Sequence, residues 1–279
     1  MDALVTTDWL ADALGADDLR VVDATYYLPS DRSDAAAEYE QAHIAGAVFM
    51  DLASLADTTT DLPSMLPTPE TFAGRMQSLG LGDGDRIVLY DRSPYTTAAR
   101  AWFMLRSFGA HNVALLDGGW AKWQAEGRPT ASGREEPHHR PFTPRADRSG
   151  VRTLDQMKAN LDSGEEQVLD ARSAARFTGE EPDPRPGTQP GHIPGSRNLP
   201  YKQVFHPDGT WKRGDELRAA FAGAGIDLSR PLVTTCGSGI TASVLAFGAH
   251  LLGHDAAVYD GSWSEWGANP STPKATGAA

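Results

Sequence analysis

Short apolar runs alternate with longer amphipathic stretches along the chain. Four of the runs span only four or five positions, are mainly apolar or β-branched, and are followed by loop-forming residues. Such brief runs are typical of buried strands. We therefore predict strands at residues 86–90, 113–116, 231–235 and 256–259.

Two of the amphipathic stretches, residues 97–108 and 241–252, have the apolar spacing of helices. Gly109 and Gly253 follow them, at the position where glycine commonly ends a helix because it tolerates positive φ. Strands that alternate with helices form mainly parallel sheets covered by helices on both faces. We therefore expect an α/β fold whose functional residues gather at the carboxyl ends of strands.

The chain is an imperfect internal duplication. Two copies of one element order are separated by 143 to 149 residues, so each copy has the size of an ordinary domain. Three motif pairs carry the repeat: Val-Val-Asp-Ala (21–24) with Val-Leu-Asp-Ala (168–171), Ala-His-Ile-Ala-Gly (42–46) with Gly-His-Ile-Pro-Gly (191–195), and Asp-Gly-Gly-Trp (117–120) with Asp-Gly-Ser-Trp (260–263).

The region between the copies is rich in proline and charge and has no hydrophobic period, which is typical of a connection between domains. We expect one domain over residues 1–130, a linker over 131–150 and a second domain over 151–279.

The duplication separates features of the fold from features of function. His43 in the first copy corresponds to His192 in the second, and each copy has a Trp-x-x-Trp pair, at 120 and 123 and at 263 and 266. Because both copies share these residues, we expect them to be structural. Cys236, in contrast, stands where the first copy has Asp91. Only the second copy therefore carries a nucleophile, and the first is expected to be non-catalytic.

Cys236 lies between a predicted strand and a predicted helix, in the loop Cys-Gly-Ser-Gly. At a helix N-terminus, unpaired N–H groups and the positive end of the helix dipole stabilise a thiolate and any anion attached to it. Gly237 and Gly239 can adopt positive φ without a Cβ clash, which lets the backbone fold tightly around the sulfur. A lone cysteine is often a buried core residue, but this loop favours a reactive thiol.

These features together resemble tandem rhodanese-domain sulfurtransferases. The loop from Cys236 to Ala242 is similar to that of 3-mercaptopyruvate sulfurtransferases within this family. The resemblance implies two rhodanese-like domains and a sulfur transfer without a cofactor or metal. In that reaction Cys236 attacks the sulfur of 3-mercaptopyruvate, pyruvate leaves, and the persulfide passes its sulfur to a thiol, cyanide or a redoxin.

The resemblance also implies roles for the rest of the loop. Backbone N–H groups of Gly237, Gly239, Ile240 and Thr241 are expected to hold the persulfide anion. Ser238 is expected to bind the substrate carbonyl or to relay a proton. The other members of a Ser-His-Asp relay are missing, because Ser64 and Ala53 stand where many relatives have histidine and an acidic residue.

The resemblance assigns the substrate carboxylate to Arg176 and Arg185. Arginine suits this role because its planar guanidinium can hold a carboxylate through two hydrogen bonds. The first copy has Pro29 in place of Arg176 and no counterpart of the stretch around Arg185, so neither arginine is needed by the fold. The alternative is that both form surface ion pairs with nearby acidic residues: Glu180, Glu181 and Asp183.

Three rival functions remain open. A thiosulfate:cyanide sulfurtransferase is disfavoured because Gly237 and Ser238 are uncharged, and a phosphatase is disfavoured because Thr235 and Ala242 replace its histidine and arginine. A non-catalytic persulfide carrier or binding module would share Cys236 but would not need the two arginines.

Composition narrows the class of partner. The net charge of −12 disfavours nucleic acid and anionic membranes as partners. The sequence has no apolar run of membrane-spanning length, no secretory signal pattern, and one cysteine, which cannot form an intramolecular disulfide. We therefore expect a cytoplasmic enzyme that acts on a small molecule.

Overall fold

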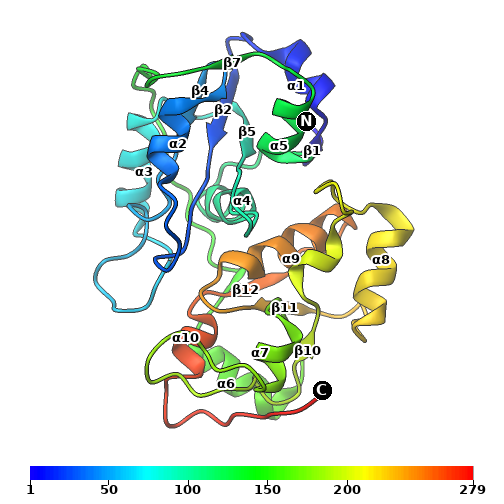
Figure 1. The fold of residues 1–279 in the computed structure, drawn as a ribbon. Helices are drawn as coiled ribbons and strands as arrows, with labels where there is room; N and C mark the ends of the chain where they lie inside the picture. Colours follow the sequence, from blue (N-terminus) through cyan, green and yellow to red (C-terminus); the bar gives the residue numbers. More distant parts are fainter. Residues whose placement is uncertain (279) are drawn as a thin grey trace. The chain divides into compact units, whose positions relative to one another are not determined.

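Each half of the chain folds around its own five-stranded parallel sheet (Figure 1). The computed structural model describes residues 1–278. These residues form two units by internal contacts. The first unit contains Met1–Asp57, Leu66–Asp147 and Pro207–Trp211, and the second contains the other described residues.

The sheet of the first unit has the strand order β1-β6-β5-β2-β4, with every neighbouring pair parallel. Helices α1 and α5 pack on one face, against Val21, Val88 and Tyr90, and α4 contacts β5 and β6. The bounds are β1 Leu4–Val5, α1 Thr7–Ala13, β2 Leu19–Asp23, α2 Ala35–Gln41, β4 Ala47–Phe49, α3 Pro69–Ser78, β5 Arg86–Tyr90, α4 Ala98–Ser107, β6 Val113–Leu116 and α5 Gly119–Ala125.

The sheet of the second unit repeats this topology, with the strand order β8-β12-β11-β9-β10. Helices α8 and α9 lie on one face and α6, α7 and α10 on the other (Figure 1). The bounds are β8 Val151–Arg152, α6 Leu154–Ser163, β9 Gln167–Asp170, α7 Ala174–Thr178, β10 Arg197–Asn198, a 3-10 turn Tyr201–Val204, α8 Gly214–Gly223, β11 Leu232–Thr235, α9 Ile240–Leu251, β12 Ala257–Tyr259 and α10 Ser262–Trp266.

The predicted α/β fold with two parallel sheets is confirmed. Strands β5 and β6 have the predicted bounds, and β11 and β12 each begin one residue later than expected. Gly109 and Gly253 have φ values of +96° and +82° just beyond α4 and α9, as expected for glycines that end helices.

The two repeated histidines have the same structural role in each unit. The His43 ring stacks on Tyr39 and its Nδ1 lies 2.9 Å from the Tyr39 carbonyl oxygen. The His192 ring stacks on Phe177 and its Nδ1 lies 2.8 Å from the Phe177 carbonyl oxygen. Both rings are buried, so these histidines serve the fold, as the duplication predicts.

The end of each unit returns to pair with this histidine segment. Strand β3 (His43–Ile44) pairs antiparallel with β7 (Thr130–Ala131), and His192 forms an antiparallel bridge with Ala275. The segment that follows β7 packs on the first unit, where Phe142 is buried and Arg140 pairs with a carboxylate.

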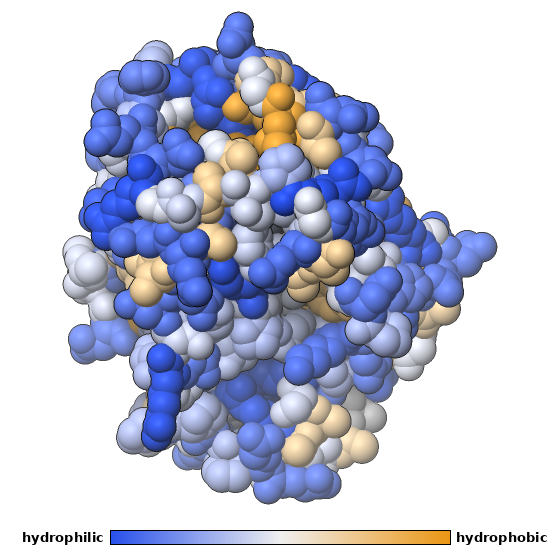
Figure 2. All heavy atoms as spheres, turned by 45° about the horizontal axis from the view of Figure 1, so that its top comes forward, coloured by the Kyte–Doolittle hydropathy of each residue, from blue (hydrophilic) through white to orange (hydrophobic). Residues whose placement is uncertain are grey.

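The face drawn in Figure 2 is mostly hydrophilic, with small apolar patches. Within residues 1–278, Met1 is the one large hydrophobic side chain that is exposed. No helix in this range has the length and hydropathy needed to cross a membrane.

Candidate active site

Cys236 is the first residue after β11, at the carboxyl end of a central strand of the second sheet. Its side chain is buried, and three residues separate it from the start of α9. Gly239 precedes that helix with a φ of +79°. Gly237 lies outside the left-handed region, so of the two loop glycines Gly239 is the one that uses positive φ.

The lack of a side chain at Gly237 instead allows two arginine side chains to approach the loop. A Cβ atom at this position would lie 3.1 Å from Nη1 and 3.2 Å from Nη2 of Arg185, and 3.6 Å from Nη2 of Arg176. The guanidinium groups therefore lie directly against the loop that carries Cys236. The structure thus brings together the nucleophile candidate and both predicted carboxylate ligands.

A buried carboxylate holds these two arginines in place. The side chain of Asp183 is fully buried and accepts hydrogen bonds from Nη2 of Arg176 at 2.6 Å and from Nη1 of Arg185 at 3.4 Å. It also accepts the backbone N–H of Arg185 at 3.0 Å. Two guanidinium groups and one carboxylate give the cluster a net charge of +1, if all three groups are ionised. The pairing with Asp183 considered above is therefore real, but it is a buried contact beside the loop and not a surface pair.

The N–H groups of the loop are free to bind an anion. Within residues 1–278, the five N–H groups from Gly237 to Thr241 have no hydrogen-bond acceptor. Ile240 is buried and Thr241 is partly exposed at the first turn of α9. Five free donors at the head of a helix, next to two arginines, form a strongly anion-attracting surface.

Ser238 is buried in the same loop. Its hydroxyl has no hydrogen-bond partner in the described part of the chain. Ser64 and Ala53 supply neither a histidine nor an acidic side chain for a relay with this hydroxyl.

The backbone of the loop is fixed by the segment that begins α10. Cys236 N–H donates to Oγ of Ser262 at 3.3 Å, and the Cys236 carbonyl accepts the N–H of Trp263 at 3.0 Å. The Gly237 carbonyl accepts from both the N–H and the hydroxyl of Ser264, at 2.9 Å and 2.5 Å. Four hydrogen bonds thus hold two consecutive residues of the loop.

A half-buried arginine supports the equivalent loop of the first unit. Arg92 follows Asp91 in that loop and donates to Asp23 at 3.3 Å and to the carbonyl of Ala42 at 2.6 Å. Its guanidinium lies 4.3 Å from the centre of the Trp120 ring, which is a favourable cation–π distance.

In the second unit a guanidinium occupies the equivalent place, but it belongs to an arginine that follows a different strand. Arg172 follows β9 and donates to Asp170 at 2.6 Å and to the carbonyl of Gly191 at 2.7 Å. Its guanidinium lies 4.5 Å from the centre of the Trp263 ring. Because this arginine follows β9, the loop position after Cys236 can be Gly237, which leaves space for Arg176 and Arg185.

Asp91 occupies the position of the nucleophile in the first unit. Its carboxylate accepts the N–H of Ala98 at 2.8 Å, at the start of α4, and its carbonyl accepts the N–H of Trp120 at 3.1 Å. Burial raises the pKa of Asp91 to about 7, with a further contribution from the charge of Asp23.

This raised pKa predicts that the stability of the first unit falls as the pH rises. Between the ordinary value of 3.8 and about 7, the folded state keeps a proton on Asp91 that the unfolded state has lost. The Asp91→Asn variant should therefore lose less stability than the wild type between about pH 5 and about pH 8, as measured by urea unfolding midpoints. Equal losses in the two proteins would contradict this assignment.

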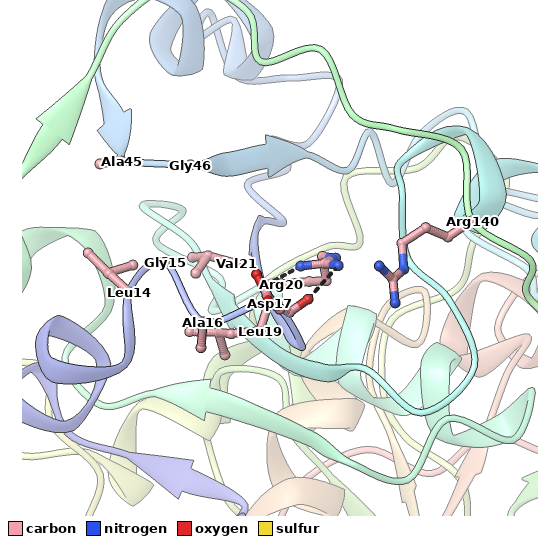
Figure 3. A pocket seen from close by; sticks show the side chains of 10 residues that line it. All are labelled: Leu14, Gly15, Ala16, Asp17, Leu19, Arg20, Val21, Ala45, Gly46 and Arg140. Atoms are coloured by element: carbon pink, nitrogen blue, oxygen red, sulfur yellow. Dashed lines mark hydrogen bonds between the residues drawn. The ribbon is translucent and has the colours of Figure 1, made fainter.

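The hollow drawn in Figure 3 lies at the opposite edge of the first sheet from the loop at Asp91, and its arginines are engaged elsewhere. It has a volume of about 480 Å³ and lies beside the start of β2, whereas Asp91 follows the end of β5. The arginines that line it already have partners, because Arg20 binds the carbonyls of Asp17 and Leu19 and Arg140 binds Asp85. No cluster of three or more metal-ligating side chains is present within residues 1–278.

Three residues of the candidate site escaped the sequence analysis: Arg172, Asp183 as a buried partner, and Ser262. One usable signal was present. The repeated motif reads Asp-Gly-Gly-Trp in the first copy and Asp-Gly-Ser-Trp in the second, so Ser262 is a difference between the copies, like Cys236.

Comparisons with known proteins agree with the duplicated fold. The family model described as "Rhodanese-like domain" matches twice, at residues 6–126 and 153–269. The human 3-mercaptopyruvate sulfurtransferase is 43% identical over 271 residues, which cover 95% of this chain and 91% of that protein.

A second relative is named for a different sulfur donor. The thiosulfate sulfurtransferase of Cricetulus griseus is 41% identical over 272 residues, which cover 95% of this chain and 91% of that protein. Among solved structures, SseA from Escherichia coli, described as a 3-mercaptopyruvate sulfotransferase, matches with a TM-score of 0.86 and 36% identity, over 94% of this chain and 99% of that one.

Proposed function

Because the chain belongs to the rhodanese-like domain family, in two tandem copies, and is a sulfurtransferase of the 3-mercaptopyruvate type, we propose that Cys236 carries the transferred sulfur as a persulfide. The observation that carries this proposal is the placement of Arg176 and Arg185 against Gly237, next to the nucleophile.

In the first step the Cys236 thiolate attacks the sulfur of 3-mercaptopyruvate and forms an S–S bond. The C–S bond breaks, its electron pair stays on carbon, and protonation of the resulting enolate gives pyruvate. In the second step the thiolate of an acceptor attacks the outer sulfur, which restores the Cys236 thiolate and leaves a persulfide on the acceptor.

Each group around the loop has a place in this reaction. Arg176 and Arg185 bind the substrate carboxylate, and the hydroxyl of Ser238 binds its carbonyl. The free N–H groups of Gly237, Gly239, Ile240 and Thr241 stabilise the persulfide anion, because fixed donors in a buried loop need no reorganisation as charge develops.

The net charge of the arginine cluster supports mercaptopyruvate over thiosulfate. Mercaptopyruvate presents one carboxylate, which matches a cluster of two guanidinium groups and the carboxylate of Asp183. Thiosulfate is a dianion and its leaving group, sulfite, is also charged, so it benefits more from cations beside the sulfur. The loop itself supplies no cation, since Gly237 and Ser238 are uncharged.

The second candidate is thiosulfate:cyanide sulfurtransferase activity, which the identity to the Cricetulus griseus enzyme favours. A steady-state comparison of the two sulfur donors with one acceptor distinguishes the candidates. We expect a higher kcat/KM with 3-mercaptopyruvate, and a higher value with thiosulfate would reverse the proposal.

A charge placed in the loop should shift this preference. Ser238→Lys is expected to raise the ratio of thiosulfate to mercaptopyruvate kcat/KM roughly fivefold, the factor for about 1 kcal/mol of added attraction to the dianion. The gain should shrink as added salt screens the charge. Ser238→Ala is the control, because it removes the hydroxyl without adding charge. An unaltered ratio in a folded Ser238→Lys protein would show that loop charge does not set donor preference.

We propose a thiol, cyanide or a redoxin as the sulfur acceptor and a cytoplasmic location. The single free cysteine and the net charge of −12 support a reducing compartment and a partner other than nucleic acid or membrane.

A further inference from the structure

We propose that Ser262 is a positioning residue that fixes the backbone of Cys236 for attack on sulfur. This proposal rests on Cys236 being the nucleophile. Ser262 is fully buried, and its hydroxyl accepts the N–H of Cys236 at 3.3 Å while it donates to the carbonyl of Tyr259 at 2.8 Å.

The backbone of Ser262 lies in the left-handed region, with a φ of +50°. This conformation is costly for a residue with a Cβ atom and costs glycine little. The first unit has Gly119 at the equivalent position, with a φ of +53°. The same positive φ is therefore adopted by glycine in the unit without a cysteine and by serine in the unit that carries Cys236.

The hydroxyl of Ser262 gives a reason to retain this strain. A glycine at this position would leave the buried N–H of Cys236 without the acceptor that Ser262 supplies. With Ser262 present, the N–H of Cys236 is bound on one side and its carbonyl is bound by Trp263 on the other. The Cα atom that carries the thiol is thus held from both directions.

The two residues after Ser262 orient the N–H groups that follow Cys236. In a trans peptide the carbonyl and the following N–H point in opposite directions. The bond from Trp263 to the Cys236 carbonyl therefore turns the N–H of Gly237 away from α10, and the bonds from Ser264 turn the N–H of Ser238 the same way. Trp263 and Ser264 thus orient the loop donors, while Ser262 holds the N–H of Cys236 itself.

The test is the pair Ser262→Gly and Ser262→Thr. Ser262→Gly relieves the backbone strain but removes two buried hydrogen bonds, so these effects should largely offset and leave the thermal unfolding midpoint close to that of the wild type. Its kcat should fall about tenfold, because small misplacements of reacting groups slow chemistry strongly. KM for 3-mercaptopyruvate should stay within about twofold, since the arginine clamp is unchanged.

Ser262→Thr should behave in the opposite way. It keeps the hydroxyl but places a β-branched residue at positive φ, so the unfolding midpoint should fall while kcat stays near the wild-type value. Ser196→Ala is the matched control, because Ser196 is also buried and its hydroxyl donates to the carbonyl three residues earlier, at 2.6 Å. This control should leave kcat unchanged.

The rate at which iodoacetamide alkylates Cys236 gives a second readout that needs no sulfur donor. Cys236 is the only thiol, so the rate reports directly on its environment. Alkylation should slow in Ser262→Gly and not in Ser196→Ala. A Ser262→Gly protein with wild-type kcat and alkylation rate would overturn the proposal, as would activities that simply follow stability across the variants. Failure of the wild type to use mercaptopyruvate would instead refute the proposed substrate, and alkylation would still test Ser262.

Discussion

Cys236→Ser is expected to lower the turnover of 3-mercaptopyruvate by at least roughly a thousandfold, as loss of a nucleophile does in covalent catalysis. The substitution changes one buried atom at the end of β11 and should leave the fold intact. Because the chain has no other cysteine, no second thiol can take over the reaction.

Intact-mass measurement identifies the intermediate. Wild-type protein incubated with 3-mercaptopyruvate and no acceptor should gain the mass of one sulfur atom, and added thiol should remove it. Cys236→Ser should gain no sulfur. Rapid turnover by this variant would show that Cys236 is not the nucleophile, and an unmodified wild type during turnover would exclude a persulfide that persists between the two steps.

Removal of either clamp arginine should have the second largest effect. Arg176→Ala and Arg185→Ala are each expected to lower kcat/KM for 3-mercaptopyruvate by about 10- to 100-fold, the loss of one charge-assisted hydrogen bond of about 1.5–3 kcal/mol. Asp183 retains one arginine partner in either variant, so no buried carboxylate is left unpaired. Folding should therefore be preserved.

Arg152→Ala is the matched control for the clamp. Arg152 lies in the same unit, is 21% exposed like Arg176, and forms a comparable ion pair with Glu166. Steady-state kinetics should show no change in this control. Unchanged kinetics in both clamp variants as well would mean that the arginines serve only to pair with Asp183.

The elements predicted from the sequence are those whose patterns are local. Buried central strands such as β5 and β11 contain apolar runs, so their bounds could be predicted to within one residue. The edge strands β1, β8 and β10 contain two residues each and are too short to show any period. Their places in the sheets are set by pairing with distant strands.

The same distinction applies to the candidate site. Cys236 and the two arginines could be proposed from short motifs and from a comparison of the two copies. The burial of Asp183 depends on how the segment between α7 and β10 folds back, which no local pattern encodes. The contact of Ser262 with Cys236 joins residues that are 26 positions apart and likewise requires the folded chain.

The arginine that pairs with the buried aspartate comes from a different sequence position in each copy, and this restricts the order in which substitutions can convert one arrangement into the other. Asp23 in the first unit and Asp170 in the second are buried at equivalent positions, and each pairs with a guanidinium, from Arg92 in one and from Arg172 in the other. Loss of the arginine before its replacement arises would leave that carboxylate without its ion-pair partner, a penalty of about 3–5 kcal/mol that is a large share of the stability of an ordinary domain. A series of single substitutions that converts one arrangement into the other is therefore favoured when an intermediate carries an arginine at both positions, the equivalents of 92 and 172. The glycine that follows Cys236 thus depends on an arginine at position 172, and a cysteine at position 91 alone would still be followed by Arg92.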